Sequence, residues 1–297
     1  MTPTSLIPPE IRARLKELRL HTHYAAMGHG LGQHPSRSRG VGMEFAQYRP
    51  YEPGDEPRQI DWKLYARSDR FFVRESERDS PLSLWLVIDA TASMAQADGD
   101  RSKLDAACSL AACAAELALR QGDAFGLVAL SAEGLTLVPA GIGPRHRDRI
   151  FLELARLKPG GRFPREAQLR PVWERVGASS LVLILSDGFD DALVELAERL
   201  AAARRQVLSI QLLTAEERDF PFTGGHVFRD PETGAEREVE AGAVREDFLV
   251  RFAQARQALA RRLGASGIGH VEYVLDRPLD EPLRRFFSVR GSEARSA

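Results

Sequence analysis

The sequence predicts a three-layer α/β fold, Rossmann-like, with a mostly parallel central sheet covered by helices on both faces. Two short apolar runs, 84–88 and 181–185, have the continuous hydrophobicity of strands that are buried on both faces. From residue 82 onward such strand-like runs alternate with stretches of helical periodicity, which favours a parallel sheet. A length of 297 residues with 43% hydrophobic residues is enough for a large core.

The elements of the main sheet domain can be placed in order from residue 82. Ser102 with Asp105 three residues later predicts a capped helix start, and Gly122 predicts the end of that helix. Residues 135–138 can pair with 125–130 as a hairpin. The predicted strands are 84–88, 125–130, 135–138, 181–185, 207–212 and 271–274, and the predicted helices are 103–120, 147–157, 165–176, 192–204 and 245–263.

The remaining regions lack the regular alternation of strands and helices. Residues 1–80 form an N-terminal segment that we expect to pack on the main domain of residues 81–297; it contains an amphipathic helix within 9–20 and a strand within 71–75. Residues 221–243 are polar around Asp230-Pro231-Glu232-Thr233-Gly234, which predicts a hairpin excursion from the main domain.

Composition excludes several classes of protein. The net charge of −1 and the lack of a reader motif argue against a nucleic-acid binder. Apolar runs such as 181–185 fall far short of the roughly 20 residues that a membrane span requires, and the first residues lack a signal-peptide pattern, so we expect a cytoplasmic protein. Cys108 and Cys113 lie five residues apart in a predicted helix, which suits two small core residues and not a disulfide framework or a zinc site.

Two predicted strands end in carboxylates. Asp89 opens the loop that carries Thr91 and Ser93, and Asp187 follows the strand 181–185. In a parallel sheet the carboxyl ends of strands share one edge, where ligands bind. Oxygen groups at alternate positions of one loop suit Mg²⁺ or Mn²⁺, so Asp89, Thr91, Ser93 and Asp187 are the predicted metal-binding residues.

Each of these features also has a purely structural interpretation. A carboxylate at a strand end often caps a turn or the next helix, and Asp190 and Asp191 can act as favourable charges at a helix N-terminus. The four histidines between 21 and 34 lack a ligand spacing and suit a solvated basic loop. Asp55, Arg58 and Asp61 can form a charge network that pins a loop to the main domain, with Trp62 as its apolar anchor.

These residues carry a resemblance to known families. Asp89-x-Thr91-x-Ser93-Met94, with Ser186-Asp187-Gly188 after a later strand, resembles the metal-ion-dependent adhesion site of von Willebrand factor A domains. The wider chain resembles the DUF58 family through Gly42-Met43-Glu44-Phe45, Arg49-Pro50-Tyr51-x-Pro53-Gly54-Asp55, Arg58-Gln59-Ile60-Asp61-Trp62, Ala66-Arg67 and Asp230-Pro231-Glu232-Thr233-Gly234. The resemblance implies a von Willebrand A-type fold without catalytic activity. It also implies a partnership with a MoxR-type AAA+ ATPase in chaperone-like maturation or assembly.

The chain departs from the adhesion-site pattern in two places. Thr91 stands where serine is usual, which keeps the oxygen. Arg162, after Gly160 and Gly161, stands where the family's loop threonine is expected. Because Arg162 brings a positive charge in place of an oxygen, we expect it to weaken divalent binding, with its guanidinium between Asp89 and Asp187 as a counter-charge.

The sequence therefore leads to a non-enzymatic adaptor that docks a protein partner, the ATPase or its client, at the Asp89 edge. The alternative is a phosphotransferase of the haloacid-dehalogenase type, with Asp89 as nucleophile, Asp187-Gly188-Phe189-Asp190-Asp191 holding Mg²⁺ and Lys158 neutralising the phosphate. This alternative lacks a cap-like insertion after Asp89 and the Asp-x-Asp pair that would supply the general acid.

Overall fold

The central element is a six-stranded sheet in which the outermost strand on one side is antiparallel to its neighbour and the others are parallel. The computed structural model describes residues 6–20, 47–51, 60–75, 82–131, 134–164 and 166–288. Across the sheet the strands follow one another as β12 (Gly269–Val274), β9 (Gln206–Leu213), β8 (Leu181–Ser186), β3 (Ser83–Asp89), β6 (Ala124–Ser131) and β7 (Gly134–Gly141). The predicted three-layer α/β class is confirmed.

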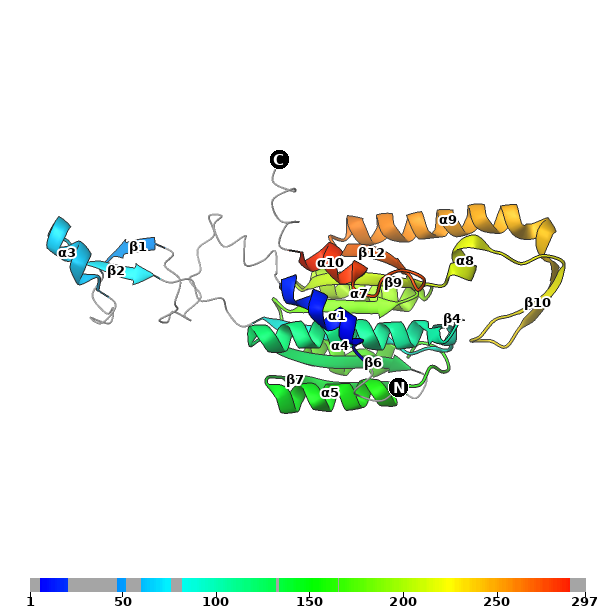
Figure 1. The fold of residues 1–297 in the computed structure, drawn as a ribbon, viewed down its shortest axis with the longest axis horizontal. Coiled ribbons are helices and arrows are strands. Elements are labelled where there is room, and N and C mark those ends of the chain that lie inside the picture. Colours follow the sequence, from blue (N-terminus) through cyan, green and yellow to red (C-terminus); the bar gives the residue numbers. More distant parts are fainter. Residues whose placement is uncertain are drawn as a thin grey trace. The chain divides into compact units, whose positions relative to one another are not determined.

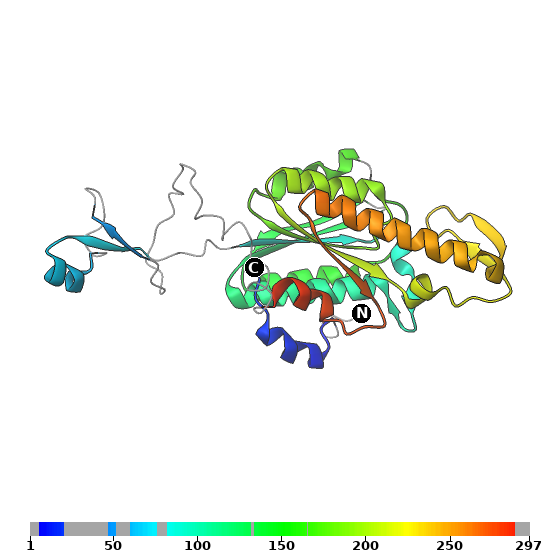
Figure 2. The same cartoon turned by 90° about the horizontal axis from the view of Figure 1, so that it is seen from above.

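Helices cover both faces of this sheet (Figure 2). Alternate side chains of β3 point to opposite faces: Leu84, Leu86 and Ile88 belong to one apolar cluster, while Trp85 and Val87 belong to the other. The first face is covered by α1 (Pro9–Arg14), α4 (Lys103–Gln121), α5 (Pro144–Arg156) and α10 (Glu281–Phe287), and the second by α6 (Arg170–Arg175), α7 (Asp191–Ala202) and α9 (Ala241–Ala265).

The predicted ends of α4 are confirmed in atomic detail. Ser102 and Asp105 form a reciprocal capping box, and Gly122 ends the helix with a φ of 77°, in the left-handed region that favours glycine. The predicted helix 165–176 is instead a 3₁₀ turn, η6 (Glu166–Leu169), followed by α6. Cys108 and Cys113 are free and buried on α4, as expected.

Several short elements were not predicted from the sequence. They are η2 (Leu15–Glu17), η5 (Ala92–Ala95), the pair β4 (Ala97–Asp98) and β5 (Arg101–Ser102), α8 (Ala215–Asp219) and α10. All of them are shorter than the two or three turns over which helical periodicity can be read. No helix in the described part of the chain is long and apolar enough to cross a membrane.

The chain divides into two compact units at different positions from the predicted boundary at residue 80. Residues 1–24 belong to the same unit as residues 82–297, and residues 25–81 form the second. The reason lies in the N-terminal helix: Ile11 and Leu15 are buried in the main core, and Arg14 forms an ion pair of 3.1 Å with the buried Asp280 before α10.

The second unit contains a two-stranded antiparallel sheet and one helix. The strands are β1 (Gln47–Pro50) and β2 (Phe72–Glu75), and the helix is α3 (Trp62–Ser68). Asp61 caps α3 by accepting bonds from the amides of Lys63 and Leu64. The Trp62 ring contacts Tyr65 and Phe71 of its own unit, and its role as an apolar anchor on the main domain stays a prediction.

The polar excursion is a hairpin of β10 (Gly225–Arg229) and β11 (Glu236–Glu240) between α8 and α9. Figure 1 shows it in yellow, on the side of the main unit where β4 and α8 lie. Phe228 of the hairpin stacks on Phe220 at 5.6 Å between ring centroids, and Phe220 packs on Phe248 of α9 at 4.6 Å. These aromatic contacts fix the base of the hairpin to the unit.

Candidate functional site

The structure brings Asp89 and Asp187 to one edge of the sheet. β3 and β8 pair in parallel with Ile88 opposite Leu185, so Asp89 lies opposite Ser186 and next to the loop that Asp187 opens. β3 also pairs with β6 on its other side, and the chain later returns to add β8, β9 and β12. The β3–β8 pair is therefore the topological switch point of the sheet, where α/β proteins bind ligands.

Asp89 is buried and its carboxylate is held by three donors. Oδ1 accepts bonds from the amide and the hydroxyl of Thr91, at 2.9 and 2.7 Å, and Oδ2 accepts one from the hydroxyl of Ser186 at 2.7 Å. Burial raises the pKa of Asp89 from 3.8 to about 6, with a further contribution from the charge of Asp187 and a partial offset from the hydrogen bonds. Burial therefore makes the charged form of Asp89 costly in this geometry.

Asp187 is buried beside a lysine that the sequence analysis did not single out. Lys103 has no exposed side-chain surface, and its Nζ lies 3.5 Å from Asp187 Oδ2 and 2.6 Å from Glu217 Oε1. It also donates to Gln96 Oε1 at 2.6 Å. The ammonium group thus has two carboxylates and an amide oxygen around it, an arrangement that satisfies a buried charge.

The loop after Asp187 requires a glycine. Gly188 has a φ of 77° and donates its amide to the Ser186 hydroxyl at 2.9 Å. A Cβ at this position would lie 2.8 Å from Leu259 Cδ2. The Ser186 hydroxyl therefore links the two loops, since it accepts from Gly188 and donates to Asp89.

Gly160 and Gly161 lie against the Asp89 loop, where the resemblance places the family's third loop. The amide of Gly160 donates to the carbonyl of Ala90, and the carbonyl of Gly161 accepts from the amide of Ala92. Arg162, however, is exposed, and within the described residues no hydrogen bond or ion pair joins it to Asp89 or Asp187. The expectation that Arg162 lies between these carboxylates is wrong, because the buried Lys103 is the cation that pairs with Asp187.

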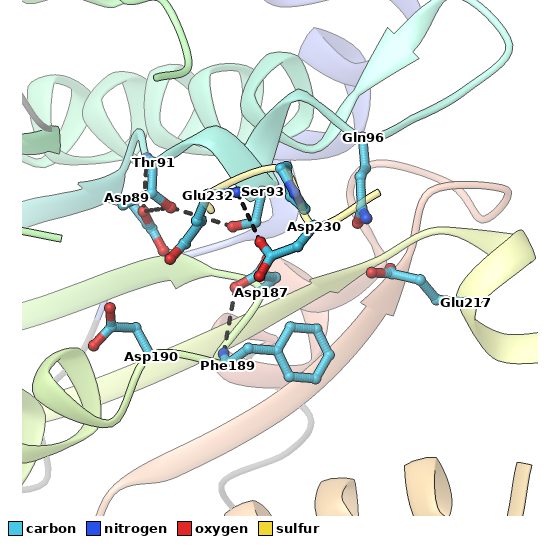
Figure 3. Close-up of a pocket in the computed structure, with 11 residues that line it drawn as sticks. Asp89, Thr91, Ser93, Gln96, Asp187, Phe189, Asp190, Glu217, Asp230 and Glu232 are labelled. Carbon is cyan, nitrogen blue, oxygen red and sulfur yellow. Dashed lines mark hydrogen bonds between the residues drawn. The ribbon is translucent and has the colours of Figure 1, made fainter. Parts of the chain in front are cut away.

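A pocket of about 240 Å³ opens over these residues (Figure 3). The hydroxyls of Thr91 and Ser93 line it and lie 3.2 Å apart. Its most prominent feature is a gathering of carboxylates from four separate segments: Asp89, Asp187, Asp190, Glu217, Asp230 and Glu232. The predicted set Asp89, Thr91, Ser93 and Asp187 is therefore in one pocket, and the tip of the β10–β11 hairpin forms part of the same wall.

The neighbouring aspartates have the structural roles that the sequence suggested. Asp190 caps α7 by accepting from the amide of Ala192 at 2.8 Å, and Asp191 in the first turn pairs with Arg262 at 3.0 Å. Asp190 lines the pocket as well. The residues Asp55 and Arg58, the histidines between 21 and 34, and the segment 42–45 lie outside the described residues.

The donor set of the pocket fits a hard divalent cation. Its open groups are carboxylate and hydroxyl oxygens, which Mg²⁺ and Mn²⁺ prefer. Among the described residues, no group of three His, Cys, Asp or Glu side chains is arranged to hold a metal ion on its own. A cation in this pocket would therefore need the Thr91 and Ser93 hydroxyls as well as carboxylates, and the predicted ligand set of Asp89, Thr91, Ser93 and Asp187 stays a prediction.

Sequence reasoning missed Lys103, Glu217 and Glu232. One signal was present for Lys103: a lysine in the first turn of a helix opposes the helix dipole, so it requires a specific counter-charge. Glu217 belongs to a capping box with Thr214 at the start of α8, and this short helix was not predicted. Glu232 stood in a motif that carried the resemblance, but nothing in the sequence placed it near Asp89.

Two solved structures with very different sequences are similar to part of this chain. The crystal structure of the conserved hypothetical protein BatB from Bacteroides thetaiotaomicron is similar over 73% of this chain and 100% of its own, with 14% identity and a TM-score of 0.46. The SpRpn10 VWA domain is similar over 69% of this chain and 95% of its own, with 10% identity and a TM-score of 0.41.

Relatives by sequence cover nearly the whole chain. The uncharacterized proteins Mb1516 of Mycobacterium bovis and Rv1480 of Mycobacterium tuberculosis are each 29% identical over 290 residues, which are 95% of this chain and 90% of theirs. The model of the family described as "Protein of unknown function DUF58" matches residues 47–258. This match covers the described residues of the second unit, the sheet edge with Asp89 and Asp187 and the hairpin tip, and the chain therefore belongs to the DUF58 family.

Proposed function

We propose that this protein is a non-enzymatic adaptor that docks a protein partner at the Asp89 edge of its sheet. The observation that supports the proposal most is the convergence of Asp89, Thr91, Ser93 and Asp187 in one open pocket at the switch point. The arrangement has the features of a cation-dependent adhesion site, which the sequence resembles.

The residues divide into two groups in this proposal. Thr91 and Ser93 present hydroxyls to the pocket beside Asp89, and together they would hold Mg²⁺ or Mn²⁺. When bound, the ion would supply a positive centre for an acidic side chain of the partner. Asp187, which is paired with the buried Lys103, fixes the floor of the pocket and keeps the negative potential that attracts the ion.

The geometry favours docking over nucleophilic catalysis. Both oxygens of Asp89 accept hydrogen bonds from the protein, and its side chain is buried. At Asp89 the chain also lacks the Asp-x-Asp pair that would supply the general acid of such a mechanism. The comparisons give no support to the haloacid-dehalogenase alternative with Asp89 as nucleophile.

For the partner we propose a MoxR-type AAA+ ATPase or the client of that ATPase, in the cytoplasm, as the family resemblance implies. The work of the complex would be chaperone-like maturation or assembly. The acidic pocket adds a chemical requirement: the docking segment presents a carboxylate to the cation, because a carboxylate without a cation would be repelled by the six that line the pocket.

The experiment is co-purification of the tagged full-length chain from its native host, with Mg²⁺ and with EDTA, followed by mass identification of what binds. We expect an ATPase or its client to be captured only with Mg²⁺. Asp89→Asn, which keeps the shape of the side chain, should lose the partner, whereas Asp247→Asn on the exposed face of α9 should retain it. Equal capture by wild type and Asp89→Asn, or capture unaffected by EDTA, contradicts the proposal.

A further inference from the structure

The turn of the β10–β11 hairpin has a defined conformation. Asp230 Oδ1 accepts from the amides of Glu232 and Thr233, at 2.8 and 3.2 Å. The backbone closes with bonds from Asp230 to the Ala235 carbonyl and from Gly234 to the Asp230 carbonyl, both at 2.8 Å. Gly234 has a φ of 72°, which a residue with a Cβ rarely adopts. The turn therefore sets the direction in which Glu232 leaves the backbone.

Glu232 differs from its neighbours in that it is turned into the pocket. Pro231 and Thr233 are exposed, whereas Glu232 is half-buried and lines the same pocket as Asp89. Figure 3 shows its side chain reaching from the hairpin tip toward the loop that carries Asp89 and Ser93. Burial and the surrounding carboxylates, including Asp187 and Asp89, raise the pKa of Glu232.

In the part of the chain that the structure describes, few contacts other than those of the Glu232 side chain hold the tip of the β10–β11 hairpin. Within the described residues, the hydrogen bonds of residues 230–235 stay inside the turn. The aromatic contacts of Phe228 lie at the base of the hairpin. The pKa of Asp230 is lowered by hydrogen bonds from the Thr233 side chain and from the amides of Glu232 and Thr233, with a smaller contribution from the charge of Arg162.

A carboxylate that points at other carboxylates is unfavourable unless a cation lies between them. The defined turn nevertheless directs Glu232 into the pocket. We propose that Glu232 is an internal carboxylate ligand of the cation bound at Asp89, so that the hairpin tip closes over the site and a partner's acidic side chain has to displace it. This inference rests on the proposed function, because it needs the same cation.

The closed tip explains how an acidic pocket can also bind an acidic side chain of a partner. With the ion present, Glu232 completes the oxygen donors from within the chain. A partner's carboxylate then competes with Glu232 for the same position, because the two carry the same charge and need the same ion. The hairpin acts as an autoinhibitory contact whose strength sets which partners can enter.

The test combines Mg²⁺ titration by calorimetry with hydrogen exchange of the amides of residues 230–235, on the full-length chain. The variants are Glu232→Gln and, as a control of equal charge change on the same hairpin, Glu238→Gln, whose side chain is exposed. In wild type and Glu238→Gln, Mg²⁺ should slow exchange at the tip. In Glu232→Gln it should not, and the affinity for Mg²⁺ should fall roughly tenfold through loss of one charged ligand.

The outcomes separate the inference from the proposed function. If wild type binds Mg²⁺ and Glu232→Gln binds it equally well, with the tip protected in both, the inference is overturned and the docking site stands. If wild type binds neither Mg²⁺ nor Mn²⁺, both are overturned. Equal exchange of wild type and Glu232→Gln without metal verifies that the turn itself is intact in the variant.

Discussion

The burial of Asp89 makes a quantitative prediction about stability in the absence of metal. Its pKa is about 6 in the folded protein against 3.8 for the ordinary group. A pKa difference of about two units corresponds to about 3 kcal/mol. The free energy of unfolding at pH 7.5 is lower by this amount than it would be without the shift, because ionised Asp89 is less favourable in the folded state. Asp89→Asn should remove this penalty, because the amide keeps an acceptor for Thr91 and can donate to the Ser186 hydroxyl.

The sign follows from proton binding. Between pH 3.8 and 6 the folded state holds the proton on Asp89 more tightly than the unfolded state, so wild-type stability falls as pH rises through this window and is then level. The Asn variant lacks this fall. Its advantage over wild type should therefore grow by about 2 kcal/mol between pH 4.5 and pH 7.5.

Urea unfolding in EDTA, followed by circular dichroism at the two pH values, measures this difference. Asp247→Asn on the surface of α9 is the matched control and should follow wild type at both pH values. Adding Mg²⁺ should stabilise wild type and leave Asp89→Asn unchanged. An Asn variant that is no more stable than wild type at pH 7.5, with no trend in pH, refutes the reasoning.

Three further predictions concern other residues of the site. Lys103→Met should lower the free energy of unfolding by roughly 3–5 kcal/mol, since it removes the cation that pairs with the carboxylates of Asp187 and Glu217. Thermal or urea unfolding at pH 7.5 measures this change, and a loss under 1 kcal/mol would contradict the assigned role of Lys103. Gly188→Ala should destabilise by at least 1 kcal/mol because of the positive φ and the contact with Leu259, and a neutral result in the same assay would show that the loop relaxes. At Mg²⁺ concentrations that saturate both proteins, Glu232→Gln should capture more partner than wild type in the pull-down at limiting protein concentration, whereas equal or weaker capture means that the hairpin does not compete.

Much of the fold could be predicted because long elements carry their own signals. The runs 84–88 and 181–185 became β3 and β8, and the Ser102–Asp105 box and Gly122 became the ends of α4. Parallel topology then placed Asp89 near Asp187 without any knowledge of distance. Periodicity could not reveal α8 or α10, which are five and seven residues long.

The rest of the site depends on contacts between distant segments. Lys103 meets Asp187 and Glu217 across 84 and 114 positions in the chain. Arg162 was predicted to lie between Asp89 and Asp187, but its side chain is exposed and the buried Lys103 pairs with Asp187. The orientation of Glu232 depends on the hairpin turn and its aromatic base, which only the three-dimensional packing of Phe220 and Phe228 defines.

The most direct test of the cation site is a crystal of the full-length chain soaked in Mn²⁺, with anomalous diffraction collected to locate the ion. We predict a single strong peak in the pocket, at about 2.1 Å from the hydroxyl oxygens of Thr91 and Ser93, with a carboxylate of Asp89 or Glu232 in its coordination shell. Mn²⁺ absent from this pocket while bound elsewhere on the chain, or a pocket that stays empty at saturating Mn²⁺, would contradict it.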